Sequence, residues 1–170
     1  MTDKLNIKML VMDVDGVLTD GGIIYDSCGN ESKRFNVHDG AWLKIWQRLG
    51  LQTAVITGRQ SVAVDRRMTE LGIDFVYQNA KVKIGVFENL VKESGINPQE
   101  MAYIGDDVMD LPVLRRVGYA VTVPDAIDEV KSHCDYITKK TGGSGAVGEL
   151  IVSMIKAMGM FDKAMERYLA

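Results

Sequence analysis

Cysteine is scarce in this chain of 170 residues, which holds only Cys28 and Cys134, far apart in the sequence. Two such residues cannot build the disulfide framework that stabilises many small secreted domains. The simplest interpretation is that both are free thiols in a reducing compartment. We therefore expect a cytoplasmic protein.

Long apolar runs and an excess of basic charge are also missing. The longest apolar stretches have the length of a strand, which is too short to cross a membrane, and "MTDKLNIK" at the start lacks the apolar core of a signal peptide. The formal net charge is −3 and no basic stripe is visible, which argues against nucleic acid as a partner. Repeats, linkers and low-complexity segments are absent, so we expect one domain over residues 1–170.

Short apolar runs alternate with helical patterns along the whole chain. The runs predict strands over residues 7–14, 52–57, 74–78, 100–105, 119–123 and 135–138. The periodic segments predict helices over residues 38–50, 61–72, 81–95, 109–118 and 126–134, with a long C-terminal helix and tail over about 145–170. Such alternation predicts an α/β fold, a Rossmann-like doubly wound parallel sheet with helices on both faces.

Residues 21–37, "GGIIYDSCGNESKRFNV", interrupt this alternation. Two alternating runs flank "SCGN", and Gly29 followed by Asn30 suits a turn with positive φ, so we expect a small β-hairpin insertion. The hairpin follows the first strand, and ligands bind beyond the carboxyl ends of the strands in a doubly wound sheet. It should therefore overhang the ligand site or meet another subunit.

Polar clusters follow successive predicted strands. In "MLVMDVDGVLTDGG" a buried strand runs directly into Asp13 and Asp15, although neighbouring carboxylates repel each other and are costly to desolvate. Later strands and the helix after the third one contribute Thr57, Gly58, Arg59, Lys83, Asp106, Asp107 and Asp110. The fold should bring these side chains to one rim.

The chemistry of these groups is complementary. A hard cation such as Mg²⁺ takes oxygen ligands, for which Asp13 and Asp106 are suited, and it would relieve their repulsion. A carboxylate can also attack phosphorus, while Thr57, backbone N–H groups near Gly58 and an ammonium hold the phosphoryl oxygens. Lys83 is the expected ammonium, with Lys81 as the alternative. Gly16 lets the chain curl so that Asp15 can act as general acid and base.

The order of these motifs resembles the haloacid dehalogenase-like (HAD) superfamily of phosphohydrolases. "DVDG", "ITG", a lysine and "GDDVMD" correspond to its four motifs, and the resemblance covers residues 10–149. It implies that Asp13 is the nucleophile and Asp15 the general acid/base. The metal would be held by Asp13, the Asp15 backbone carbonyl and Asp106. Asp107 and Asp110 would be supporting acids.

The chain has no room for the cap domain that many such enzymes carry. The segment from Asp15 to Thr57 holds only the hairpin and one helix, and that from Thr57 to Lys83 only one helix and one strand. Small-substrate chemistry benefits from excluding water. Either a macromolecular substrate covers the site or a neighbouring subunit supplies the lid.

"DGVLTDGGIIYD", "GNESKRFNVHDG" and "GGSGAVGE" resemble the phosphatases that act on 3-deoxy-D-manno-octulosonate 8-phosphate (Kdo-8-phosphate) in lipopolysaccharide biosynthesis. This resemblance implies a homotetramer that is built by the hairpin, with neighbouring subunits completing each site. The substrate-facing residues that it implies are Lys33, Asn36, Asp39, Arg59 and Gly143, with His38 a boundary residue of the next helix.

The sequence departs from that family at three positions. Ser144 and Gly148 stand where basic residues often occur, and Asn79 stands where glycine is common. An anionic sugar acid would lose up to two partners, for which Arg59 or Lys33 would have to compensate. The alternatives are therefore a nine-carbon keto-sugar 9-phosphate, a phosphoprotein, or a non-catalytic oligomerisation module.

Overall fold

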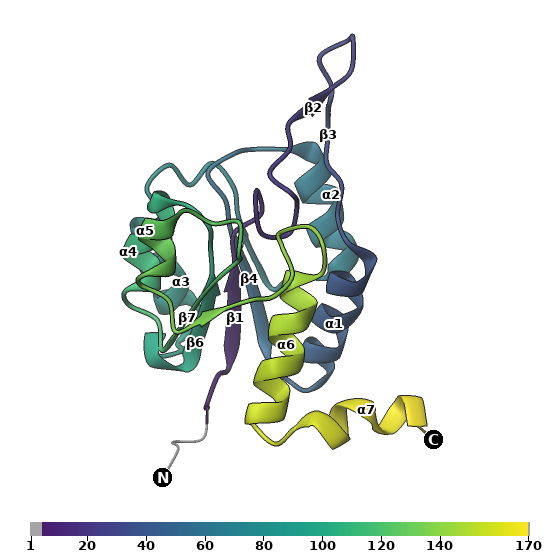
Figure 1. Ribbon diagram of the computed structural model, residues 1–170, viewed down its shortest axis with the longest axis vertical. Coiled ribbons are helices and arrows are strands. Elements are labelled where there is room, and N and C mark those ends of the chain that lie inside the picture. Colours follow the sequence, from purple (N-terminus) through teal and green to yellow (C-terminus); the bar gives the residue numbers. More distant parts are fainter. Residues whose placement is uncertain (1–4, 170) are drawn as a thin grey trace.

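The structure is a computed structural model that describes residues 5–169. Within these residues six strands form a parallel sheet in the order β5-β4-β1-β6-β7-β8 (Figure 1). The strands are β1 (Met9–Met12), β4 (Gln52–Ile56), β5 (Phe75–Tyr77), β6 (Met101–Ile104), β7 (Tyr119–Thr122) and β8 (Tyr136–Ile137). The predicted α/β class and the parallel sheet are confirmed.

Helices cover both faces of this sheet (Figure 1). One face packs against α1 (Val37–Arg48), α2 (Val62–Leu71) and α6 (Ala146–Ala157). The other packs against α3 (Lys83–Ser94), α4 (Leu111–Leu114) and α5 (Asp128–Lys131). In β1, Leu10 and Met12 enter the first core and Met9 and Val11 the second. Burial on both faces explains the continuous apolar run of this strand.

The C-terminal segment differs from the prediction of one long helix. The helical conformation ends after α6, where Gly159 has φ +70°, and a separate helix, α7 (Phe161–Leu169), follows. Glycine adopts this left-handed conformation at no steric cost, and it ends the helix. The helices predicted over 109–118 and 126–134 are also shorter, since the 3₁₀ helix η2 (Val108–Asp110) precedes α4 and α5 has four residues. A second 3₁₀ helix, η1 (Pro98–Glu100), precedes β6.

The sheet order places the ends of three strands side by side. β1 pairs with β4 on one side and with β6 on the other. The chain leaves these neighbouring strands at Asp13, Thr57 and Gly105, at the same edge of the sheet. This is the switch point where doubly wound sheets bind ligands.

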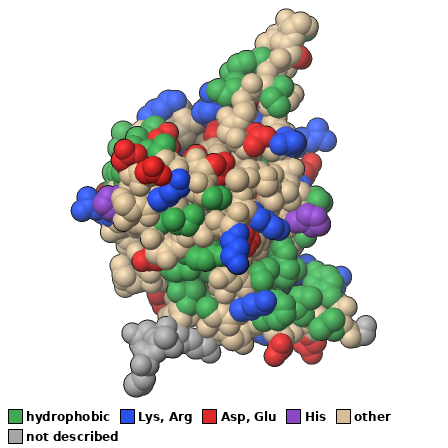
Figure 2. Space-filling model, in the orientation of Figure 1, with side chains coloured by type: hydrophobic (Ala, Val, Ile, Leu, Met, Phe, Trp, Pro, Cys, Tyr) green, Lys and Arg blue, Asp and Glu red, His purple; other side chains and the backbone are tan. Residues whose placement is uncertain are grey.

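The predicted hairpin is present as β2 (Ile24–Tyr25) and β3 (Glu31–Ser32), with Gly29 at φ +83° in its turn. It projects from the carboxyl edge of the sheet (Figure 1). Apolar side chains are visible along it in Figure 2, and Ile23, Ile24 and Tyr25 are each at least half exposed. None of the helices described over residues 5–169 has the length and apolar character to cross a bilayer.

Candidate active site

A cavity of about 170 Å³ opens at the switch point of the sheet. Its lining consists of Asp13, Asp15, Thr57, Gly58, Arg59, Lys83, Asp106, Asp107 and Met109. Eight of these nine residues are among those singled out from the sequence. Residues from four separate segments of the chain therefore meet in one place.

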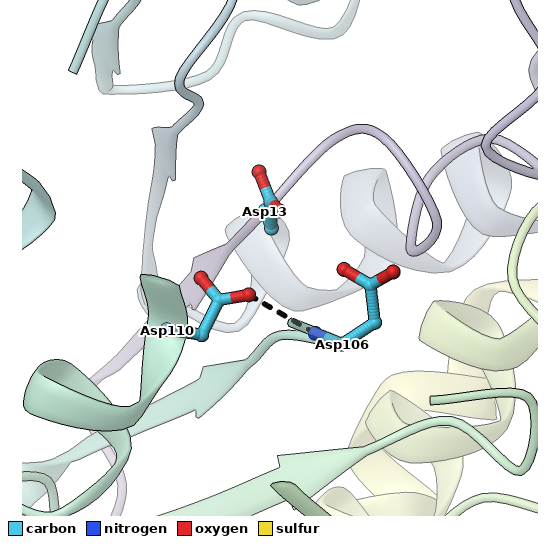
Figure 3. Close-up of side chains that lie close together, drawn as sticks. All are labelled: Asp13, Asp106 and Asp110. Carbon is cyan, nitrogen blue, oxygen red and sulfur yellow. Dashed lines mark hydrogen bonds between the residues drawn. The ribbon is translucent and has the colours of Figure 1, made fainter. Parts of the chain in front are cut away.

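Three carboxylates converge beside this cavity (Figure 3). Oxygens of Asp13, Asp106 and Asp110 lie within 4.8 Å of one another. Burial, then the charge of Asp110, raises the pKa of Asp13 to about 7 against the opposing effect of Lys83. Burial, then the charges of Asp13 and Asp110, raises the pKa of Asp106 to about 7. The cluster carries more negative charge than Lys83 alone offsets.

The donor set fits a hard divalent cation. Asp106 Oδ1 is buried and has no hydrogen-bond partner among residues 5–169. A buried oxygen without a partner is costly, and a metal ion would satisfy it. Asp13 Oδ1 already accepts a hydrogen bond of 2.7 Å from the Val14 N–H, which fixes the orientation of that carboxylate.

Asp110 connects the parts of the site through four hydrogen bonds that its carboxylate accepts. Its Oδ1 accepts hydrogen bonds from Lys83 Nζ at 2.6 Å and from the Tyr103 hydroxyl at 2.5 Å. Its Oδ2 accepts from the backbone N–H groups of Asp106 and Asp107 at 3.1 and 3.2 Å. This fully buried carboxylate is thus saturated. It holds the turn that carries Asp106, while Asp107 uses its own side chain to cap η2.

Lys83 and Lys81 have different environments. Lys83 is buried, lines the cavity and lies 2.8 Å from Asp13 Oδ2. Lys81 is exposed and donates to the Gly58 carbonyl at 2.9 Å. Lys83 therefore occupies the position from which an ammonium can meet a phosphoryl group. Thr57, also buried, lies in the same lining.

Asp15 lies at the mouth of the cavity among side chains from the hairpin. The Lys33 ammonium forms an ion pair with Asp15 Oδ1, and Lys33 also lies 3.6 Å from Glu31 Oε1. Arg59 Nε lies 4.0 Å from Asp15 Oδ2. The side chain of Asp15 thus lies between the cations of Lys33 and Arg59, in the same cavity lining as Asp13 and Asp106.

Four predicted substrate residues lie outside the cavity lining: Lys33, which pairs with Asp15, and Asn36, Asp39 and Gly143. Asn36 caps α1 by accepting from the His38 N–H, and its side-chain amide donates to the Gly143 carbonyl at 3.4 Å. Gly143, at φ +67°, donates to the Val17 carbonyl at 3.0 Å. Asp39 is buried between α1 and α6, where it accepts from the Gly148 N–H at 2.7 Å. In this chain Asn36, Gly143 and Asp39 fix the loop before α6.

Two of the three departures from the family pattern, Asn79 and Gly148, have local explanations. Asn79 has φ +56°, a conformation that asparagine tolerates better than most residues, so the turn is kept without glycine. A Cβ at Gly148 would lie 3.0 Å from Trp42 Cδ1 and 3.3 Å from Asp39 Oδ1. Because glycine has no side chain, α6 can pack closely on α1 at this position.

Sequence reasoning missed Tyr103, Glu31 and Tyr25. Tyr103 is the one residue with a polar tip in the apolar strand "MAYI", which was the available signal. Glu31 lies in β3 and Lys33 follows directly after that strand, so an extended backbone over both would turn their side chains to one face. That spacing indicates that the two charges belong to one network.

Comparisons with known proteins identify relatives of this chain. A family model described as haloacid dehalogenase-like hydrolase matches residues 76–151. The 3-deoxy-D-manno-octulosonate 8-phosphate phosphatase of Salmonella typhi is 40% identical over 164 residues, which cover 96% of this chain and 87% of that protein. The enzyme of the same name from Haemophilus influenzae is 39% identical, with 96% and 93% covered.

Solved structures are similarly close. The phosphatase of the same name from Moraxella catarrhalis, in complex with magnesium, phosphate and Kdo, has a TM-score of 0.94 and 43% identity, covering 97% of this chain and 95% of that one. The cobalt-bound phosphatase from Haemophilus influenzae has a TM-score of 0.91 and 38% identity, covering 99% and 100%.

The parallel sheet, the cavity at its switch point and the four motifs that line it are those of a haloacid dehalogenase-like hydrolase. Sequence identity over nearly the full length of this chain and of its relatives assigns it to one family within that class. The chain belongs to the family of the 3-deoxy-D-manno-octulosonate 8-phosphate phosphatases.

Proposed function

We propose that the protein is a Mg²⁺-dependent phosphatase that hydrolyses Kdo-8-phosphate to Kdo and phosphate. The observation that carries this proposal is the cavity in which Asp13 and Lys83 lie 2.8 Å apart beside the unsatisfied Asp106 carboxylate. Relatives of the same family carry this activity in their names, and one of them holds magnesium, phosphate and Kdo together.

Asp13, Asp106 and the backbone carbonyl of Asp15 would hold the metal. The bound ion would supply charge neutralisation, so that an anionic phosphate can approach the anionic nucleophile. Asp110 would keep the Asp106 turn in place through its hydrogen bonds to the Asp106 and Asp107 N–H groups.

Asp13 would act as the nucleophile. One of its carboxylate oxygens attacks phosphorus, the bond from phosphorus to the sugar oxygen breaks, and an aspartyl-phosphate forms. Lys83, the Thr57 hydroxyl and the N–H groups near Gly58 hold the phosphoryl oxygens as charge shifts toward them. Asp15 donates a proton to the leaving sugar oxygen, so Kdo departs as a neutral alcohol at that position.

Asp15 would then reverse its role. It takes a proton from a water molecule, whose oxygen attacks the phosphorus of the aspartyl-phosphate. The bond between phosphorus and the Asp13 oxygen breaks, which releases inorganic phosphate and restores the Asp13 carboxylate. Lys33, which contacts Asp15, and Arg59 would bind the sugar acid at the mouth of the cavity.

We also infer a homotetramer in which hairpins of neighbouring subunits complete each site. The exposed apolar residues Ile23, Ile24 and Tyr25 support this arrangement, because such side chains on a projecting hairpin favour burial against a partner. The inferred working place is the cytoplasm, supported by the free thiols of Cys28 and Cys134.

The test is release of free phosphate from a panel of substrates: Kdo-8-phosphate, a nine-carbon keto-sugar 9-phosphate, glucose 6-phosphate and a phosphopeptide. We expect the highest kcat/KM for Kdo-8-phosphate, and loss of turnover with EDTA and in Asp13→Asn. A preference for the nine-carbon ester or the phosphopeptide would replace the substrate and keep the chemistry. Turnover at background on every ester would point to a non-catalytic module.

A further inference from the structure

The hairpin contacts the active site through Arg59. Arg59 Nη2 donates to Glu31 Oε1 at 2.5 Å and to the Tyr25 hydroxyl at 3.2 Å. Both acceptors belong to the hairpin, in β3 and β2, whereas Arg59 follows β4 and lines the cavity. The hairpin, which was expected to overhang the ligand site or to meet another subunit, therefore holds a cavity residue of its own chain.

Arg59 has one buried donor that these contacts leave unused. Its Nε is buried and has no acceptor within the described part of the chain. Asp15 Oδ2, at 4.0 Å, is too far away for a hydrogen bond. Asp15 and Arg59 both line the cavity, so a ligand bound there would lie beside the Arg59 side chain. A buried donor without a partner is costly, which favours such a ligand.

The guanidinium is planar and its five N–H bonds have fixed directions. Fixing Nη2 with two acceptors therefore fixes the direction of the Nε–H bond as well. Glu31 is itself held, since Lys33 Nζ lies 3.6 Å from the same Oε1 and the Lys33 side chain is only 1% exposed. The orientation of Arg59 is thus set before any substrate arrives.

We propose that Glu31 and Tyr25 are positioning residues that hold Arg59 so that its Nε–H binds an anionic oxygen of the substrate. This rests on the proposed function for the identity of the substrate. The anionic oxygen belongs either to the phosphoryl group or to the carboxylate of the sugar acid. The hairpin then contributes to substrate binding within its own subunit, in addition to any contact between subunits.

The first experiment measures kcat and KM for Kdo-8-phosphate in Glu31→Gln and Tyr25→Phe. Losing a charge-assisted hydrogen bond should raise KM about tenfold in Glu31→Gln, and less in Tyr25→Phe, with kcat changed by less than about threefold. In an Arg59→Gln background the effect of Glu31→Gln should disappear, because the two residues act through one interaction. Additive effects would overturn the proposal.

The matched control is Asp20→Asn. Asp20 also ties the hairpin region to the chain, by a 2.6 Å ion pair between its Oδ2 and Arg34 Nη2, but it has no contact with Arg59. KM should remain within about twofold of the wild-type value, as expected for an exposed ion pair. An equal rise of KM in Asp20→Asn would mean that general anchoring of the hairpin matters, which would overturn the role of Glu31.

Two further readouts separate this inference from the proposed function. Inhibition constants for inorganic phosphate and for Kdo, compared between wild type and Glu31→Gln, identify which anionic oxygen Arg59 binds, and no change in either would contradict the proposal. A second readout is the ¹⁵N–¹H resonance of Arg59 Nε, which reports the orientation of the Arg59 guanidinium without any substrate. It should be shifted and slow to exchange in wild type, and lose both properties in Glu31→Gln. An unchanged resonance overturns the inference even if Kdo-8-phosphate is hydrolysed.

Discussion

The Lys83 ammonium lies 2.8 Å from Asp13 Oδ2 and 2.6 Å from Asp110 Oδ1, and it is buried with both carboxylates. The single Lys83 ammonium thus forms ion pairs with two carboxylates. In the proposed mechanism Lys83 also meets the incoming phosphoryl group, so its position links the stability of the site to its chemistry.

Lys83→Met should lower both activity and stability. The substitution keeps the length of the side chain but leaves two buried carboxylates without their cation, which costs about 3–5 kcal/mol of unfolding free energy when a buried partner is lost. We expect phosphate release to fall more than about hundredfold. The exposed Lys81→Met is the control, and comparable losses in both variants would contradict the assignment of Lys83.

Gly16→Ala should disrupt the metal site. Gly16 has φ +88°, and a Cβ at this position would collide with the carboxylate of Asp106. Alanine therefore strains the backbone and displaces a proposed metal ligand. We expect Mg²⁺ affinity, measured by titration calorimetry, to fall at least about tenfold. Gly29→Ala, at φ +83° with nothing within 4 Å, provides the strain without the collision and should keep the affinity.

Stabilisation by Mg²⁺ should be larger at about pH 8 than at about pH 6. The pKa values of Asp13 and Asp106 are raised from 3.8 to about 7 in the folded, metal-free chain. Between these values the folded state holds protons that the unfolded state has lost, so the metal-free unfolding free energy falls as pH rises toward 7. Below pH 7 the metal must displace these protons.

Thermal melts with Mg²⁺ and with EDTA at the two pH values check this expectation. Asp106→Asn removes one of the repelling carboxylates, which is also a proposed metal ligand. The Mg²⁺-dependent rise in Tm should therefore be small at both pH values. An equal rise at both pH values in wild type would show that the protons are not coupled to metal binding.

Ile24→Lys should weaken the proposed tetramer. Ile24 is 50% exposed on the hairpin, and a charge there would have to be desolvated in an interface. Light scattering should show a lower mass, and the active sites would lose the lid that neighbours supply. Ile137→Lys, on the edge strand β8, is the control for a new surface lysine. A wild-type monomer would refute the tetramer directly.

The fold could be predicted because buried parallel strands are continuous apolar runs. The segments that meet at the cavity could be predicted because Asp13, Thr57 and Asp106 each follow such a run within two residues. The carboxyl ends of parallel strands share an edge, so order along the sequence becomes proximity in space.

What could not be predicted depends on contacts between distant positions. Asp39 accepts from Gly148, 109 residues further on, and no periodicity encodes that pairing. The break between α6 and α7 was missed because the surrounding methionines favour a continuous helix, while the single Gly159, with its positive φ, separates the two helices.

Tyr103→Phe should lower activity without disturbing the core. Tyr103 is fully buried in β6, and its hydroxyl donates to Asp110 Oδ1 at 2.5 Å. Phenylalanine fills the same space but leaves Asp110 with one donor fewer, at a cost of about 1–3 kcal/mol in unfolding free energy. Because the same oxygen holds Lys83, we expect kcat to fall several-fold while KM changes little.

Tyr77→Phe is the matched control for that substitution. Its hydroxyl also donates to a carboxylate at 2.5 Å, but the acceptor is the Glu93 side chain on the surface, away from the cavity lining. Water can replace this hydrogen bond, so kcat should remain within about twofold of wild type. If Tyr103→Phe leaves kcat unchanged as well, Asp110 holds Lys83 without help from the strand beneath it, and the hydroxyl serves packing of the core alone.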